Sequence, residues 1–222
     1  MGKAIIWDLD GTLLDSYHVI VESLRLAFQE FGVSMTYEDI WQYAITFSST
    51  ALIDEVSCQI GVPAGDILLR YSQISGSRYT HIRPMEHSLE TLEKLSQMGV
   101  EHYVYTHRGK TTMPVLEHLG IDHYFKEVLT SRSGFARKPA PDAICYLLNK
   151  YGLSKEDTYY AGDRSLDMEC AENAGIPGIL YLPQGSRGTA TGTEAFVVRD
   201  LLQIPDIFKC AYRLNSASHH IL

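Results

Sequence analysis

Two carboxylates separated by one residue follow a short apolar run near the start of the chain. The run 4–7 leads into Asp8 and Asp10, with Leu9 between them and Gly11 after them. Alternate residues of a strand point to opposite faces, so Asp8 and Asp10 share one face, and Gly11 permits a sharp turn. Two acids this close repel unless a cation or a shared proton lies between them. The pattern predicts a strand that delivers two acids to the edge of a sheet. The alternative is a strand end with two solvated carboxylates.

Further polar groups follow two later apolar runs. Thr106 ends the run 102–106, and Asp163 comes directly after the run 158–162, with Asp167 four residues further on. Lys138 stands just before a helical pattern that begins near residue 142. Ligands of open parallel sheets bind beyond the carboxyl ends of the strands. We therefore expect a hydroxyl, a lysine and several carboxylates to meet at one edge of one sheet.

The elements that must position these groups alternate between strand and helix. Apolar runs typical of buried strands occupy 4–8, 102–106, 125–130, 158–162, 178–182 and 195–198, and helical periodicity marks 111–119, 142–151, 166–174 and 200–209. Such alternation predicts right-handed crossovers and a parallel sheet. The predicted fold class is α/β, with a Rossmann-like parallel sheet sandwiched by helices.

A run of helical patterns separates the first strand from the others. Apolar residues recur at helical spacing from about residue 15 to about residue 80, and no convincing strand occurs there. We expect an inserted helical cap at 15–82, and a catalytic core formed by 1–14 and 83–214. The segment 183–194 is rich in Gly, Ser and Thr and is expected to be a mobile loop, and 215–222 a disordered tail.

Composition narrows the class of protein. The net charge of −8 without a basic block argues against a general nucleic-acid binder. The first apolar run is too short for a signal peptide or a membrane span, so no membrane partner is expected. The four cysteines are scattered without a CxxC pair, which favours reduced thiols in a cytoplasmic protein over zinc ligation. We expect a monomer or weak homodimer.

The four polar segments resemble the sequence motifs of the haloacid dehalogenase-like hydrolases. The motifs are Asp8-x-Asp10-Gly-Thr, Thr106 after a strand, Lys138-Pro before a helix, and Gly-Asp163-x-x-x-Asp167, in the order found in that family. The helical insert resembles the small helical cap of the family, and within it the chain is most similar to phosphoglycolate-phosphatase-like enzymes. The resemblance implies a phosphatase that acts on a small phosphorylated metabolite.

The residues themselves suit that chemistry. A carboxylate can accept a phosphoryl group, and Asp8 is the candidate nucleophile. Attack on a phosphate ester brings two anions together and needs a cation, and Mg²⁺ prefers oxygen ligands. Asp8 and Asp163 offer carboxylates to Mg²⁺, and the resemblance adds the backbone carbonyl of Asp10. The side chain of Asp10 is then free to act as general acid and base, as the resemblance also implies.

The phosphate needs its own ligands. Lys138 offers a positive charge to the phosphoryl oxygens, Thr106 a hydroxyl donor, and His107 a backbone N–H. The side chains of His107 and Arg108 are further candidates, with solvated or structural roles as the alternative. Asp167 is expected to orient Lys138 or a metal-bound water.

Three functions remain open from the sequence. The first is a Mg²⁺-dependent phosphatase that works through an aspartyl-phosphate on a small phosphate ester. The second is a sugar-phosphate mutase of the same superfamily, which uses the same two aspartates. The third is a non-catalytic module that binds a phosphorylated metabolite. The presence of Asp10 argues against the third, because a pure binder has no need of an acid–base group.

Overall fold

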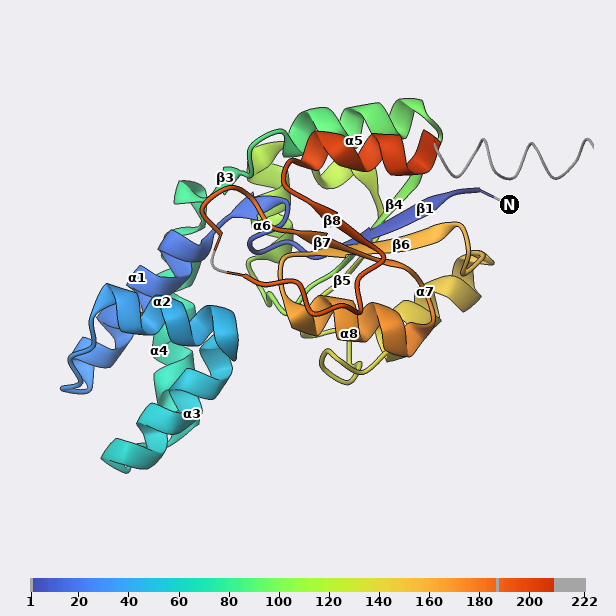
Figure 1. Ribbon diagram of the computed structural model, residues 1–222. Helices are drawn as coiled ribbons and strands as arrows, with labels where there is room; N and C mark the ends of the chain where they lie inside the picture. Colours follow the sequence, from blue (N-terminus) through green and yellow to red (C-terminus); the bar gives the residue numbers. More distant parts are fainter. Residues whose placement is uncertain (1, 187, 210–222) are drawn as a thin grey trace, which may run out of the picture.

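A parallel sheet forms the centre of the computed structural model, which describes residues 2–186 and 188–209 (Figure 1). Its six strands lie in the order β5-β4-β1-β6-β7-β8. They span β1 Ala4–Trp7, β4 Glu101–Tyr105, β5 Phe125–Leu129, β6 Thr158–Gly162, β7 Gly178–Tyr181 and β8 Phe196–Val198. Parallel strands need crossover connections, which the helices between them supply. β1 lies between β4 and β6, so whatever follows β1 lies near the middle of the carboxyl edge.

Helices cover both faces of the sheet. The helices are α5 Ser88–Gln97, α6 Thr112–Leu119, α7 Asp142–Tyr151 and α8 Ser165–Ala174. The alternation of β1 divides the core, because Ile5 and Trp7 pack with α5, α6 and residues 201–208, whereas Ala4 and Ile6 pack with α7 and α8. Leu9 continues the first set. Every side chain of β1 is therefore buried, as expected for a central parallel strand.

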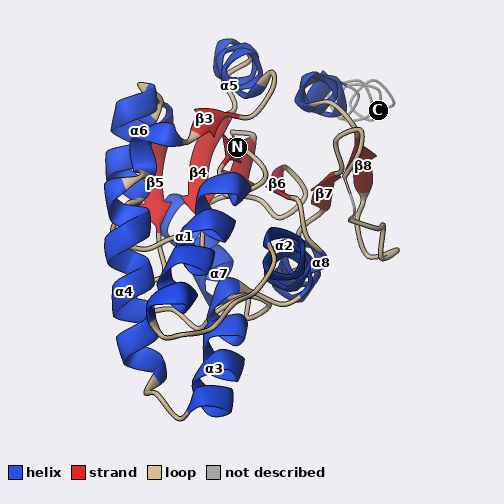
Figure 2. Cartoon of the chain, turned by 90° about the vertical axis from the view of Figure 1, so that its left-hand side faces the viewer, coloured by secondary structure: helices blue, strands red, loops and turns tan. Residues whose placement is uncertain are grey.

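Four helices form an insert beside the carboxyl ends of the strands (Figure 2). They are α1 Tyr17–Glu30, α2 Tyr37–Thr46, α3 Ser49–Ile60 and α4 Ala64–Ser77. The insert has its own apolar cluster, which includes Leu24, Phe28, Ile40 and Ile53. The chain enters and leaves it through an antiparallel pair, β2 Leu14–Asp15 with β3 Arg83–Pro84. This pair fixes both connections side by side at the edge where the predicted site lies.

The predicted fold class is confirmed. The predicted helix 142–151 and strand 158–162 have the expected bounds, and the other elements differ by one or two residues at their ends. The end of the chain differs more, because 201–203 form a 3-10 turn before the helical residues 204–209. The antiparallel pair at 14–15 and 83–84 was not predicted, since two-residue strands carry no periodic signal. The division at 15–82 stays a prediction, and the tail 215–222 lies outside the described residues.

Two observations concern the class of protein. Within the described part of the chain, no helix is both long and apolar enough to cross a membrane. Cys58, Cys145 and Cys170 are free thiols.

Candidate active site

The end of β1 places Asp8 at the carboxyl edge of the sheet. Its backbone N–H donates to the carbonyl of Ala161 in β6 at 2.8 Å, so the pairing of the two strands continues to this residue. The side chain is 3% exposed. Gly11 follows with a φ of +85°, a conformation that other residues rarely adopt. A Cβ at Gly11 would lie 2.3 Å from Asp163 Oδ2, so glycine here also keeps room for the neighbouring acid.

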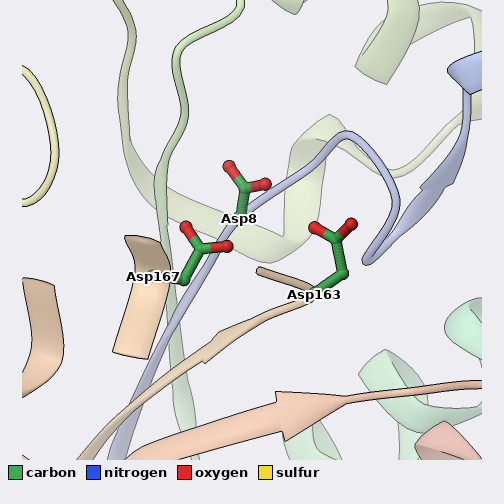
Figure 3. A group of neighbouring side chains, drawn as sticks. All are labelled: Asp8, Asp163 and Asp167. Carbon is green, nitrogen blue, oxygen red and sulfur yellow. The ribbon is translucent and has the colours of Figure 1, made fainter. Parts of the chain in front are cut away.

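Three carboxylates from three segments meet at this edge. Asp8, Asp163 and Asp167 each bring an oxygen within 4.8 Å of the others. Figure 3 shows that they come from the end of β1, the end of β6 and the first turn of α8. Gly162 permits the approach of α8, because a Cβ there would lie 2.4 Å from Cβ of Asp167. Residues some 155 positions apart in the chain thus form one cluster, as the motif spacing predicted.

Lys138 bridges two of these acids. Its Nζ donates to Asp8 Oδ1 and to Asp167 Oδ1, each at 2.7 Å. The lysine side chain is fully buried. His107 Nε2 accepts from the Lys138 backbone N–H at 3.0 Å, which fixes the backbone of the lysine. The Tyr160 hydroxyl donates to Asp167 Oδ1 at 3.2 Å, which fixes one of the acids that the lysine contacts. The lysine therefore lies in a fixed position between the candidate nucleophile and the acid on α8.

Burial and charge act in opposite directions on the acids of this cluster. Burial raises the pKa of Asp8 to about 6, although Lys138 opposes the shift. Burial likewise raises the pKa of Asp163 to about 7, against the opposing charge of Arg164. For Asp167 burial acts in the same sense, but Lys138 and then Arg164 outweigh it, so its pKa is lowered. One lysine does not compensate three carboxylates, of which Asp8 and Asp167 are buried and Asp163 is partly buried.

Asp10 lies apart from this cluster and has a different partner. Arg108 donates to Asp10 Oδ1 through Nη2 at 2.5 Å and through Nε at 3.0 Å, and the Ser16 hydroxyl donates to the same oxygen at 2.6 Å. Asp10 Oδ2 has one long contact, 3.3 Å from Arg108 Nε. Burial raises the pKa of Asp10, but the charge of Arg108 outweighs it and the pKa is lowered. One oxygen of Asp10 is thus anchored by three short contacts, while the other has only one long contact.

The predicted phosphate ligands have distinct surroundings. Thr106 is buried, and its hydroxyl accepts from the Arg108 backbone N–H at 3.1 Å, which shapes the loop after β4. The imidazole of His107 accepts from the backbone of Lys138, and burial followed by the charge of Lys138 lowers its pKa to about 3. A neutral ring in this position supports Lys138. The side-chain role in phosphate binding stays a prediction.

The donor set fits a hard divalent cation. Oxygen ligands are what Mg²⁺ prefers, and the cluster offers three carboxylates within a small volume. The raised pKa values of Asp8 and Asp163 are those of buried carboxylates short of positive charge. Asp8 and Asp163 match the predicted ligands, and Asp167 joins them in space. The Asp10 side chain points to Arg108, which leaves only its backbone carbonyl as a candidate ligand, as the resemblance implied.

A cavity of about 570 Å³ lies between the insert and the loops at the edge of the sheet. The insert contributes apolar and hydroxyl side chains, among them Ile20, Ser48 and Leu69. The core side contributes Asp10 and His107 together with several cationic side chains. Asp10 is therefore the acid of the site that faces the space where a leaving group would lie.

Sequence reasoning missed three residues of the site. Tyr17, at the start of α1, donates its hydroxyl to Asp163 Oδ2 at 2.8 Å. Ser16 anchors Asp10 at 2.6 Å. Arg164 lines the cavity next to Asp163, and its buried Nε has no hydrogen-bond partner among the described residues. Position directly after Asp163, inside the fourth motif, was the available signal for Arg164, whereas nothing in the sequence distinguished Tyr17 from the apolar face of its helix.

Comparison with known proteins identifies the family of the chain. A family model described as haloacid dehalogenase-like hydrolase matches residues 5–181. The chain belongs to this family. The predicted resemblance is therefore confirmed, and the protein is an enzyme of the hydrolase class. The family model spans the segments that carry all four motifs.

Individual members of the family match over most of the chain. A phosphoglycolate phosphatase of Pasteurella multocida (strain Pm70) is 30% identical over 220 residues, which cover 93% of this chain and 98% of that protein. One of Aliivibrio fischeri (strain ATCC 700601 / ES114) is 30% identical over 78% of this chain and 81% of its own. A crystal structure from Haemophilus somnus 129pt, described as a predicted phosphoglycolate phosphatase, has a TM-score of 0.79 at 24% identity and covers 93% of this chain and 97% of that one. The last likeness concerns the fold alone.

Proposed function

We propose that this hydrolase is a Mg²⁺-dependent phosphatase that cleaves a small phosphate monoester through an aspartyl-phosphate on Asp8. The observation that carries the proposal is the meeting of Asp8, Asp163 and Asp167 within 4.8 Å, with Lys138 2.7 Å from Asp8. The names of the relatives favour phosphoglycolate as the ester. The alternative, in which these carboxylates are solvated, does not account for a buried lysine that contacts both Asp8 and Asp167.

In the first step Asp8 attacks phosphorus. Lys138 holds Asp8 Oδ1, so Oδ2 is the oxygen available to form the new P–O bond. The bond from phosphorus to the leaving oxygen breaks, and Asp10 in its protonated form donates a proton to the departing alkoxide. The lowered pKa of Asp10 makes this form the minor one in the unliganded protein. Lys138 places positive charge beside the phosphoryl oxygens, where negative charge is concentrated in phosphoryl transfer. When bound, Mg²⁺ supplies further positive charge at this position through Asp8 and Asp163.

In the second step water releases the phosphoryl group. Asp10, now without its proton, accepts one from a water molecule that attacks the phosphorus. The bond between phosphorus and Asp8 breaks, which frees phosphate and restores the carboxylate of Asp8. Ser16 and Arg108 keep Asp10 in one orientation for both steps. Oδ2 of Asp10 serves as proton donor first and proton acceptor second.

The experiment measures phosphate release from 2-phosphoglycolate and from an aryl phosphate. We expect turnover with Mg²⁺, its loss with EDTA, and its return when Mg²⁺ is added in excess. Asp8→Asn should abolish activity because an amide does not attack phosphorus. Asp54→Asn, the same change at an exposed site on α3, should retain it.

Three results would contradict the proposal. Release of phosphate by Asp8→Asn at a rate near that of the native protein would exclude Asp8 as nucleophile. Absence of turnover over a wide panel of esters would favour a binding module. Isomerisation of a sugar phosphate with little phosphate released would identify a mutase.

The proposed setting of the enzyme follows from the same features. We propose a cytoplasmic protein whose partner is a small phosphate ester, with no nucleic-acid or membrane partner. The net charge of −8 and the local cationic lining of the cavity support a small anionic ligand over an extended polyanion. A monomer or weak homodimer is expected from size-exclusion chromatography with light scattering.

A further inference from the structure

Arg108 occupies an unusual position between the acid–base residue and the cavity. Its side chain is 8% exposed and is held on two sides. Nε and Nη2 grip Asp10, and Nη1 donates to the Thr111 hydroxyl at 3.0 Å. Its backbone N–H is fixed by Thr106. The guanidinium is therefore rigid before any ligand arrives, which reduces the entropy lost on binding.

A count of hydrogens shows what this guanidinium still offers. Arginine has five N–H groups in a planar fork. Asp10 takes one from Nε and one from Nη2, and Thr111 takes one from Nη1. One N–H on Nη1 and one on Nη2 therefore have no acceptor among the described residues. Paired N–H groups of this kind match the two oxygens of a carboxylate.

The charge of the cavity supports an anionic ligand beyond the phosphate. Its lining includes one carboxylate, Asp10, which is already paired with Arg108. The cationic side chains of the lining are Arg108, Lys110, Arg132, Arg137 and Arg164. This excess of positive charge stands in a protein whose net charge is −8. The phosphoryl group itself has Lys138 outside this lining, so Arg108 is available to the remainder of the substrate.

We propose that Arg108 is the specificity-determining residue, and that it binds a carboxylate on the leaving group of the substrate through Nη1 and Nη2. Asp10 Oδ2 must contact the leaving oxygen, and Arg108 is hydrogen-bonded to that same Asp10. The carboxylate therefore lies only a few bonds from the ester oxygen, which describes a short 2-hydroxy acid phosphate. This inference rests on the proposed phosphatase function and adds the residue that selects the substrate.

The test compares two esters that differ in the carboxylate. The kcat/KM for 2-phosphoglycolate and for ethyl phosphate is measured with the native protein, Arg108→Gln and Arg108→Lys. We expect the native enzyme to prefer the carboxylated ester by on the order of 100-fold. Arg108→Gln should lower this ratio at least about tenfold, since intrinsic differences between the esters cancel between variants. Arg108→Lys keeps the charge but loses the paired N–H groups, so its kcat/KM ratio should lie between those of the native protein and Arg108→Gln.

A matched control separates the fork from charge in general. Lys110→Gln removes one positive charge from the same lining, at an exposed side chain that makes no hydrogen bond or ion pair with Asp10 in the described part of the chain. The ratio should change less than about threefold in this variant. An equal fall in Lys110→Gln and Arg108→Gln would overturn the proposal, as would an Arg108→Gln variant that loses activity on both esters to the same extent. The second result would make Arg108 only a support for Asp10.

A binding measurement keeps this inference separate from the proposed activity. Calorimetry of glycolate with the native protein and with Arg108→Gln needs no turnover. If no ester is hydrolysed, the phosphatase proposal fails, and glycolate binding that Arg108→Gln abolishes would still support the role of Arg108. Glycolate binding that is equal in both proteins would refute that role even if the enzyme is active. Thermal unfolding of each variant verifies that it is folded.

Discussion

Replacement of Lys138 by methionine should destabilise the metal-free protein strongly. The lysine side chain is fully buried, and Nζ donates to two carboxylates at 2.7 Å. Methionine has a similar length but no charge, so the substitution leaves Asp8 and Asp167 buried beside each other without their partner. Removal of one member of a buried ion pair costs about 3–5 kcal/mol. In a protein of this size that corresponds to a fall in Tm of roughly 6–20 °C.

The assay is urea unfolding at pH 7 with EDTA present, for four proteins of a double-mutant cycle. Asp8→Asn removes one of the two acids that Lys138 contacts. Asp8→Asn should therefore lower the free energy of unfolding less in the Lys138→Met background than in the native protein. We expect a coupling free energy of about 1–3 kcal/mol. Lys150→Met is the matched control, because Lys150 is 44% exposed in its pair with Glu127. The free energy of unfolding should change by less than about 1 kcal/mol there.

The pH dependence gives a second readout of the same interaction. The pKa of Asp167 is lowered in the native protein, so its contribution to stability is present above its unfolded pKa and is lost as the pH falls through the folded value. Without Lys138, burial should raise that pKa instead, so Lys138→Met should lose less stability on acidification. The difference in free energy of unfolding between the native protein and Lys138→Met should therefore become smaller from pH 7 to pH 5. A Lys138→Met protein within about 1 kcal/mol of the native one, with additive effects in the cycle, would refute this reasoning.

Three further predictions address separate features. Burial lowers the pKa of His102 to about 4, so its contribution to stability is complete above its unfolded pKa near 6.5. The free energy of unfolding should fall by about 3 kcal/mol as the pH drops toward 4, which urea unfolding at several pH values measures. The same dependence of the free energy of unfolding on pH in His102→Asn would contradict this prediction. Gly162→Ala places a Cβ 2.4 Å from Asp167 and should lower the free energy of unfolding by about 1–3 kcal/mol. Gly65→Ala is the control, because its Cβ would have no atom within 4 Å, and it should not lower that free energy. Equal changes in the free energy of unfolding of the two variants in urea would exclude the contact with Asp167 as the cause. Asp10→Asn should reduce kcat about 10²- to 10⁴-fold in a phosphate-release assay with less effect on KM, and a loss below about tenfold would exclude Asp10 as the proton donor.

The sequence predicted the parts of the site that lie at strand ends. Asp8 and Asp163 were placed correctly at one edge because a parallel sheet brings the ends of its strands together whatever their distance along the chain. The alternation of β1 also predicted that Leu9 would point away from Asp8. Leu9 packs in the core cluster that contains Ile5 and Trp7. Strand periodicity and topology sufficed for these positions.

Other features depend on contacts that periodicity does not encode. The pairing of Arg108 with Asp10 needs the exact path of two loops, and the contact of Tyr17 with Asp163 needs the orientation of the insert. The role of His107 beside the phosphate stays a prediction, and the hydrogen bond that its ring accepts from the Lys138 backbone N–H was not predicted. Side-chain partners across loops are set by tertiary packing rather than by local pattern.

The most direct measurement of the central claim is the chemical capture of the phosphorylated residue. The enzyme is mixed with Mg²⁺ and substrate, quenched, reduced with borohydride and analysed by peptide mass spectrometry. An acyl phosphate on aspartate is reduced to homoserine, and the account predicts this product at position 8 in the native protein and none in Asp8→Asn. Reduction at a different residue, or continued turnover without any reduced aspartate at position 8, would contradict the account.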